Sequence, residues 1–265
     1  MIIHHLRNAT FVIESEDRFI LVDPMLGPKG SLPAFARFKH KPLPNPIVDL
    51  PDSVDAILNR VNFCMVTHSQ KWGIEALTHT DHFDPVGKAF LLEKDIPLAC
   101  PANDAGYMEK NGIQVAAAPG YWQTLEFAGG NITAVPAQHG HGWVHKLMAN
   151  GAGFLLELPG EPSIYVAGDT VYTKDVHRTL TELKPGIAVV AAGCASLDIG
   201  GPILMPLEEI LTFVENAPGQ VIANHLEALN HCPTTRAGLS EILAEVKLAD
   251  KVRIPYDGEQ FLVDV

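Results

Sequence analysis

The sequence is poor in cysteine and in net positive charge, and it has no long run of apolar residues. Its 4 cysteines among 265 residues form no CxxC pair and are too few for the disulfide framework of a small secreted protein. The formal net charge of −12 argues against a nucleic-acid partner, because binding to phosphates needs a basic surface. We therefore expect reduced thiols and a small-molecule substrate, with no nucleic-acid partner.

The sequence also has no feature that points to a membrane. No apolar run approaches the roughly 18 residues that a membrane-spanning helix needs, and the first residues, MIIHHLRNATF, lack the basic and apolar regions of a signal peptide. These absences predict a cytoplasmic protein with no membrane partner, and they leave open whether the chain forms a homo-oligomer. Hydrophobic residues make up 47% of the chain and no hydrophilic linker interrupts it, so we expect residues 1–265 to form a single domain.

Short runs of β-branched and aromatic residues at 10–14 and 18–23 predict an antiparallel meander near the start of the chain. Further along, strand-like runs alternate with helical ones. We expect strands at 63–67, 96–100, 131–137, 153–158, 163–168, 187–192 and 221–225, two closing strands, and helices near 53–59, 85–94, 103–110, 173–183, 206–216 and 235–247. This order predicts a mixed α/β fold with two sheets and flanking helices.

A proline-rich segment at 27–51 interrupts this pattern. Its six prolines remove backbone donors and favour an extended loop. Phe35 and Phe38 suggest a lid over a pocket, although a plain surface crossing fits the same residues. The segment also carries basic side chains that either attract an anionic substrate or form a solvated face: Lys29, Arg37, Lys39 and Lys41.

Histidine and aspartate residues repeatedly follow the expected strands, where side chains can converge at one edge of a sheet. They are His68, Asp81, His82, His139, Asp169 and His225. Imidazole and carboxylate ligands together suit zinc, iron or manganese, and a carboxylate between two histidine groups can bridge two ions. The pattern predicts a metal site.

These residues carry a resemblance to a known family. The chain resembles the metallo-β-lactamase-fold hydrolases, whose pattern is HxHxDH, then a histidine, an aspartate in a GDT-like turn and a last histidine. The similarity runs from ILVDP at 20–24 through YVAGDT at 165–170 to ANHLEALNHC at 223–232. Within the family it resembles the single-domain branch that includes ascorbate-6-phosphate lactonase. The resemblance implies a four-layer αββα sandwich with a dinuclear metal site at the strand ends.

The HxHxDH motif is interrupted in this sequence, and two registers are open. In one, HTDH at 79–82 supplies the last four positions and the first falls on Leu77, which cannot bind a metal. In the other, residues 69–77 are an insertion, and removing them restores the motif from His68 through His82. We favour the second register. It requires a closed excursion at 69–77, with Trp72 near its tip either covering substrate or packing in the protein.

The resemblance assigns a role to each ligand position. His68, His79 and His139 would hold one divalent ion, with His141 as the competitor for the third position. Asp81, His82 and His225 would hold the other, and Asp169 would bridge both. We expect zinc or manganese, with iron as an alternative. Asp23 either orients a ligand or forms a turn before Pro24, and His231 either faces the substrate or has a structural role.

The implied activity is hydrolysis. Two ions that share a water lower its pKa, so that a bridging hydroxide can attack an ester, lactone, amide or phosphoester bond. Asp81 would be catalytic by orienting that nucleophile and accepting its proton, and His231 would be catalytic as a proton donor or oxyanion stabiliser. Two other functions stay open: an iron-dependent redox or dioxygen enzyme on the same fold, and a non-catalytic metal-binding protein.

Overall fold

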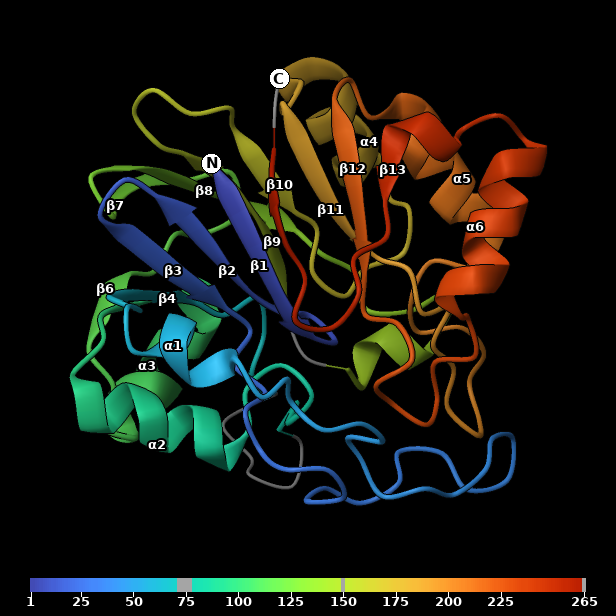
Figure 1. Ribbon diagram of the computed structural model, residues 1–265, viewed down its shortest axis with the longest axis horizontal. Coiled ribbons are helices and arrows are strands. Elements are labelled where there is room, and N and C mark those ends of the chain that lie inside the picture. Colours follow the sequence, from blue (N-terminus) through green and yellow to red (C-terminus); the bar gives the residue numbers. More distant parts are fainter. Residues whose placement is uncertain (71–77, 149–150, 264–265) are drawn as a thin grey trace.

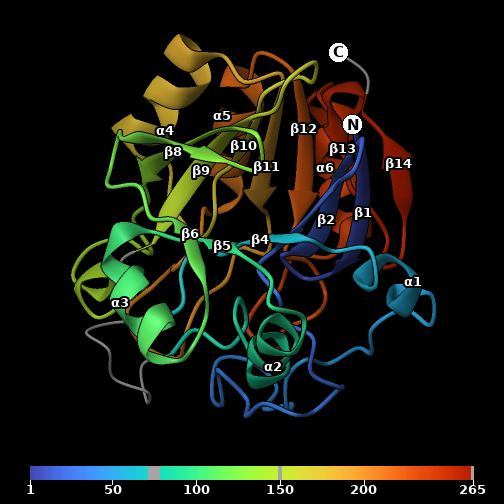
Figure 2. The same cartoon turned by 90° about the vertical axis from the view of Figure 1, so that its left-hand side faces the viewer.

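The computed structural model describes residues 1–70, 78–148 and 151–263. Two seven-stranded sheets pack against each other, in the strand orders β14-β1-β2-β3-β4-β5-β6 and β13-β12-β11-β10-β9-β8-β7. Helices α1, α2 and α3 lie beside the first sheet, and α4, α5 and α6 lie beside the second (Figures 1 and 2). The predicted four-layer αββα sandwich is confirmed. That residues 1–265 form one domain stays a prediction.

The first sheet begins as an antiparallel meander of β1 (Ile2–Arg7), β2 (Thr10–Ser15) and β3 (Arg18–Val22). It continues with parallel strands β4 (Phe63–Met65), β5 (Leu98–Ala99) and β6 (Val115–Ala117), and β14 (Gln260–Leu262) pairs with β1. The helices of this half are α1 (Val54–Leu58), α2 (Pro85–Lys94) and α3 (Ala102–Lys110).

The second sheet repeats this change from antiparallel to parallel pairing. Its antiparallel strands are β7 (Thr124–Phe127), β8 (Gly130–Pro136), β9 (Ala152–Glu157) and β10 (Ile164–Val166), and β11 (Ile187–Ala191), β12 (Gln220–Asn224) and β13 (Val252–Arg253) continue in parallel. Its helices are α4 (Lys174–Arg178), α5 (Leu207–Asn216) and α6 (Arg236–Glu245). Among the described residues, no helix is long and apolar enough to cross a membrane.

Successive side chains along the strands point to opposite faces of each sheet, and the apolar ones form three buried layers. Ile13 and Ile20 point between the sheets, whereas Val12 and Leu21 point toward the helices of the first half. In the second sheet, Phe154 joins the core between the sheets and Leu155 packs under α4 and α5. Successive strand side chains face opposite sides, so each sheet can be buried on both faces.

The expected strands and helices are found with small shifts of their ends, and α2 begins at Pro85 with Asp84 as its cap. Three strands were missed: β1, β6 and β7. In β1, the polar residues His5 and Arg7 are buried, which hides the alternation from the sequence. The helix expected at 173–183 is α4 followed by a π-helical turn at Thr179–Leu183.

The proline-rich segment at 27–51 lies at the end of the molecule opposite both chain termini (Figures 1 and 2). Its start is fixed by a buried arginine. Arg7 donates from Nη2 to the carbonyls of Met25 (2.8 Å) and Gly27 (2.9 Å) and from Nη1 to the carbonyl of Val48 (3.1 Å). Burial lowers the pKa of Arg7 to about 10, so the guanidinium stays charged at neutral pH.

Replacing Arg7 tests how far this anchor stabilises the fold. We expect Arg7→Met to lower the free energy of unfolding by about 2–4 kcal/mol, because three carbonyls lose a donor in a site that water does not reach. Urea denaturation measures the change. Arg37→Met, at an exposed position of the same segment, serves as the control and should stay within about 0.5 kcal/mol. Equal stability of the two variants would contradict the expectation.

Candidate metal centre

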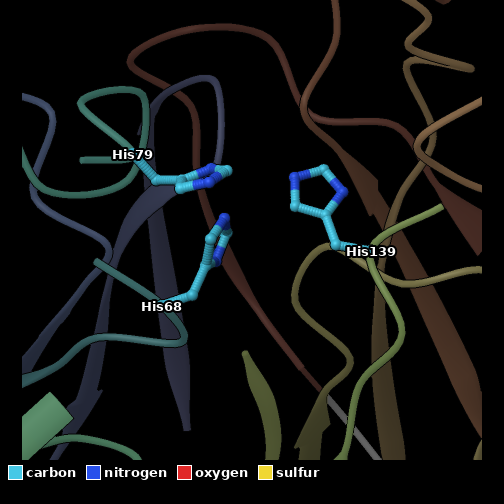
Figure 3. A group of neighbouring side chains, drawn as sticks. All are labelled: His68, His79 and His139. Carbon is cyan, nitrogen blue, oxygen red and sulfur yellow. The ribbon is translucent and has the colours of Figure 1, made fainter. Parts of the chain in front are cut away.

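Three histidines from separate parts of the chain face one space (Figure 3). His68 follows β4, His79 follows residues 69–77, and His139 follows β8. Their ring centroids lie 4.7 Å apart for His68 and His79, 5.4 Å for His68 and His139, and 5.2 Å for His79 and His139. Each offers one ring nitrogen to a group whose atoms all lie within 4.8 Å of one another, a geometry that could hold a metal ion.

A backbone hydrogen bond brings His79 close to His68. The His79 amide donates to the carbonyl of Ser69, the residue after His68, at 2.8 Å. Asp104 of α3 holds Ser69 in place, since it accepts from the amide of Ser69 (2.9 Å) and from its hydroxyl (2.6 Å). This placement of His68 agrees with the favoured register. Leu77 and Trp72, on which the other expectations rested, lie outside the described residues.

A second group lies beside the first and consists of Asp81, His82, Asp169 and His225. Asp169, after β10, faces both groups. Its Oδ1 lies 3.1 Å from His82 Nε2 and 3.7 Å from His225 Nε2. Its Oδ2 lies 3.5 Å from His139 Nε2 and 3.9 Å from His68 Nε2. One carboxylate oxygen therefore faces each histidine group, which is the arrangement of a bridging ligand.

Two ligand atoms of the cluster are buried without a hydrogen bond in the described part of the chain. They are His68 Nε2 and Asp169 Oδ1, and the Nε2 atoms of His82 and His225 lie 3.3 Å apart. Burial lowers the pKa of His68 and lowers that of His79 to about 4, so both rings are neutral at pH 7. Buried lone pairs without donors cost free energy unless a cation accepts them, so the residues present fit metal binding.

Asp23 orients two of the histidines at once. His82 donates from Nδ1 to Asp23 Oδ2 at 2.8 Å, which turns its Nε2 toward the cluster. The same carboxylate accepts from the amide of Thr67 (2.7 Å) and from its hydroxyl (2.8 Å). Since the hydroxyl proton goes to Asp23, Thr67 Oγ1 is left to accept from His68 Nδ1 at 3.1 Å. Asp23 thus does more than form a turn, because it fixes the tautomers of His82 and His68.

The remaining histidines have weaker outer partners. His139 donates from Nδ1 to the carbonyl of Ile203 at 2.8 Å, and His225 Nδ1 lies 3.5 Å from Cys232 Sγ. His141, the competitor of His139, is exposed and pairs with Glu209 at 2.6 Å outside the cluster. His139 is therefore the residue that the structure brings to the other histidines.

A cavity of about 170 Å³ opens onto the cluster. Its lining joins part of the cluster to an apolar wall: Phe35, Thr78, His79, Thr80, Asp81, His139, Met148, Leu197, Ile203 and His231. Phe38, by contrast, is 92% exposed, so Phe35 is the aromatic of the proline-rich segment that reaches the cavity. Lys29, Arg37, Lys39 and Lys41 are exposed and do not line it.

His231 lies in this cavity wall. Its side chain is buried, and its Nδ1 has no hydrogen-bond partner in the part of the chain that the structure describes. The edge of one ring meets the face of the other between His231 and Phe35, with centroids 5.4 Å apart. Burial lowers the pKa of His231 to about 4, so the ring is neutral at pH 7 and can donate one proton.

The chain is similar to known proteins over most of its length. A family model described as the beta-lactamase superfamily domain matches residues 18–226. UPF0173 protein YddR of Bacillus subtilis is 33% identical over 264 residues, which is 98% of this chain and 99% of the relative. The isothiocyanate hydrolase from Delia radicum gut bacteria has a similar structure, with 32% identity, a TM-score of 0.85 and 99% of each chain covered. A possible metal-dependent hydrolase of Veillonella parvula is also similar in structure, with 27% identity, a TM-score of 0.86 and 99% of each chain covered.

The role of Asp23 can be tested through metal affinity. Asp23→Asn keeps the size of the side chain and suits its left-handed backbone, φ 45°, but an amide nitrogen in place of one oxygen cannot accept from His82 or Thr67. We expect metal affinity to fall about 10- to 100-fold, measured by competition with a chromogenic chelator. Asp17→Asn, at an exposed turn, is the control. Unchanged affinity of Asp23→Asn would show that the carboxylate only forms the turn.

Proposed function

This chain belongs to the beta-lactamase superfamily, and from that premise we propose that it is a metal-dependent hydrolase of small molecules. The observation that carries the proposal is the position of Asp169, with one carboxylate oxygen toward each histidine group. The relatives described as hydrolases, which cover 99% of this chain, support the same reading.

We propose two divalent ions, zinc or manganese, with iron as the alternative. His68, His79 and His139 would bind one ion, Asp81, His82 and His225 the other, and Asp169 both. Bound there, the ions would lower the pKa of a shared water toward neutrality and polarise the electrophile. Imidazole nitrogens and carboxylate oxygens are ligands that suit these metals.

Asp81 is the proposed base. Its carboxylate lines the cavity, with Oδ1 4.0 Å from His79 Nδ1 and Oδ2 4.0 Å from His82 Nε2. Asn8 donates to the Asp81 carbonyl at 3.0 Å and so holds its backbone. From this position the carboxylate can orient the attacking water and accept its proton. His231, across the same cavity, would donate a proton to the leaving group or stabilise the oxyanion.

We propose that the cleaved bond is an ester, lactone, amide or phosphoester bond. The phosphoester is the weakest of these, because no lysine or arginine lines the cavity among the described residues. The cavity is also small compared with the roughly 300–1,000 Å³ of sites for drug-sized ligands, which favours a small substrate.

A second candidate reaction is the hydrolysis of an isothiocyanate. A small cavity with one apolar wall suits a neutral R–N=C=S molecule, and the isothiocyanate hydrolase resembles this chain over 99% of its length. Water oxygen would bond to the central carbon, and a proton would reach the nitrogen to give a thiocarbamic acid. Loss of its C–N bond with a second proton shift releases an amine and carbonyl sulfide.

The other expectations continue as proposals. An iron-dependent redox enzyme and a non-catalytic metal-binding protein are the alternatives to a hydrolase. A cytoplasmic location, the lack of a nucleic-acid or membrane partner, and a homo-oligomer belong with the proposed function.

Activity assays with Asp81→Ala test the hydrolase directly. We expect the zinc- or manganese-loaded protein to hydrolyse at least one member of a panel of lactone, ester, amide, phosphodiester and isothiocyanate substrates. Asp81→Ala should lower kcat about 10²- to 10⁴-fold or more, since it loses the proposed base and a ligand. Asp17→Ala is the matched control. Chelation should abolish turnover and lower the free energy of unfolding, by about 3 kcal/mol where the ion had been at 100 times its Kd. Activity that survives in Asp81→Ala, or a panel with no turnover, would contradict the proposal.

His231→Gln tests the proposed proton donor separately from the metal. Its expected effect is a decrease in kcat of about 10²- to 10⁴-fold with little change in KM, because the side chain would act on the transition state. Metal content, measured by elemental analysis, should equal that of the unsubstituted protein. A kcat within a few-fold of normal would leave His231 with a structural role only.

A further inference from the structure

Residues 31–45 of the proline-rich segment, here called the clamped segment, carry Phe35 into the cavity wall and are held in place from two other loops. We propose that this segment determines specificity, and that Phe35 selects uncharged substrates whose side chain ends in a small apolar group. The inference rests on the proposed function and specifies its substrate class.

Asn230 forms the first clamp. Its Oδ1 accepts from the amide of Phe35 at 2.9 Å, and its Nδ2 donates to the carbonyls of Ala36 (2.7 Å) and Lys41 (3.0 Å). The Asn230 amide donates in turn to Asn45 Oδ1 at 2.8 Å. Asn230 directly precedes His231 in the chain, so the bonds that set the position of Phe35 also fix the backbone of His231.

Asp198 forms the second clamp. Its Oδ1 accepts from the amides of Phe38 and Lys39, both at 2.9 Å, and its Oδ2 accepts from the amide of Arg37 at 2.9 Å. Asp198 directly follows Leu197, which lines the cavity. The clamped segment is therefore bonded to the two loops that supply His231 and Leu197 to the same wall.

The side chains around Phe35 explain which substrates this wall would accept. Phe35, Met148 and Leu197 pack on one buried apolar cluster that contains Ile203. The basic side chains of the segment are exposed, and none lines the cavity. An anionic group beside Phe35 would lose its water without a cationic side chain to pair with, which is costly. A branched alkyl group there would bury apolar surface instead.

Two pairs of compounds of nearly equal shape test this discrimination. The hydrolysis pair is methyl 4-methylpentanoate and methyl hydrogen succinate, which differ in a terminal isopropyl group against a carboxylate. The binding pair is 3-methylbutane-1-sulfonamide and 3-sulfamoylpropanoate, which are not hydrolysed. For the metal-loaded protein we expect at least about tenfold higher kcat/KM for the neutral ester, followed by pH-stat, and at least about tenfold tighter binding of the neutral sulfonamide, followed by calorimetry.

Three variants locate the effect at the clamped segment. Phe35→Ala should lower kcat/KM for the neutral ester about tenfold, mainly through KM, and Phe35→Lys should reverse the preference in both pairs. Asn230→Ala should also lower kcat/KM for the neutral ester by releasing Phe35, and it should lower kcat as well because Asn230 holds the backbone of His231. Phe38→Ala, exposed on the same segment, should change neither pair. Equal metal content and far-UV circular dichroism establish that the variants are folded.

The two readouts separate the inference from the proposed function. Turnover of both esters at similar kcat/KM, or a Phe35→Lys variant with the original preference, would overturn the inference while the hydrolase stands. No turnover of either ester or of the wider panel, together with tighter binding of the neutral sulfonamide that Phe35→Lys reverses, would overturn the hydrolase while supporting the selectivity of the wall. Equal binding of the two sulfonamides would overturn the inference whatever the esters show.

Discussion

The structure depends on one costly arrangement: five imidazoles and two carboxylates gather in one place, and all of them except the half-buried His79 are buried. The free-energy cost of burying polar atoms is greatest around Asp169, because each of its oxygens lies within 3.9 Å of the ring nitrogens of two histidines. No hydrophobic contact can compensate a lone pair that has no donor, so the fold must hold these side chains in place against their own preference for water. Cations bound by the two groups would form bonds with these lone pairs, so metal binding would be coupled to folding.

The protein holds four of the five rings through their second nitrogen, with a different partner for each. His82 has the carboxylate of Asp23, His139 the carbonyl of Ile203, His225 the thiol of Cys232, and His68 the hydroxyl of Thr67. A carboxylate raises the basicity of an imidazole more than a carbonyl or a thiol does. Asp23, the strongest of these partners, accepts from His82 in the group with Asp81 and His225. It also accepts from Thr67, which pairs with His68 of the other group. The two groups are linked outside the cluster as well as through Asp169.

The sequence predicted the elements that follow local rules and failed where contacts between distant residues decide. Asp84 followed by Pro85 predicted the start of α2, because a capping residue and a proline in the first turn are local signals. The histidines and aspartates that follow successive strands predicted the candidate metal cluster, since the ends of neighbouring strands meet at one edge of a sheet. Neither Asn230 nor Asp198 could be recognised as a clamp, because each acts on groups more than a hundred residues away in the chain. For the same reason Phe35 could not be separated from Phe38, although one lines the cavity and the other is exposed.

Supporting and reacting side chains are neighbours in the chain at several points of the site. Thr67 bonds to Asp23 and the next residue is His68; Asn230 bonds to the clamped segment and the next is His231; Leu197 lines the cavity and the next is Asp198. In each pair one side chain faces the site or lines the cavity, while its neighbour bonds to the scaffold. A displacement of the supporting side chain is then passed to the reacting one through a single peptide unit. The wall around Phe35 and the cluster around Asp169 therefore respond to changes in loops that touch neither substrate nor metal.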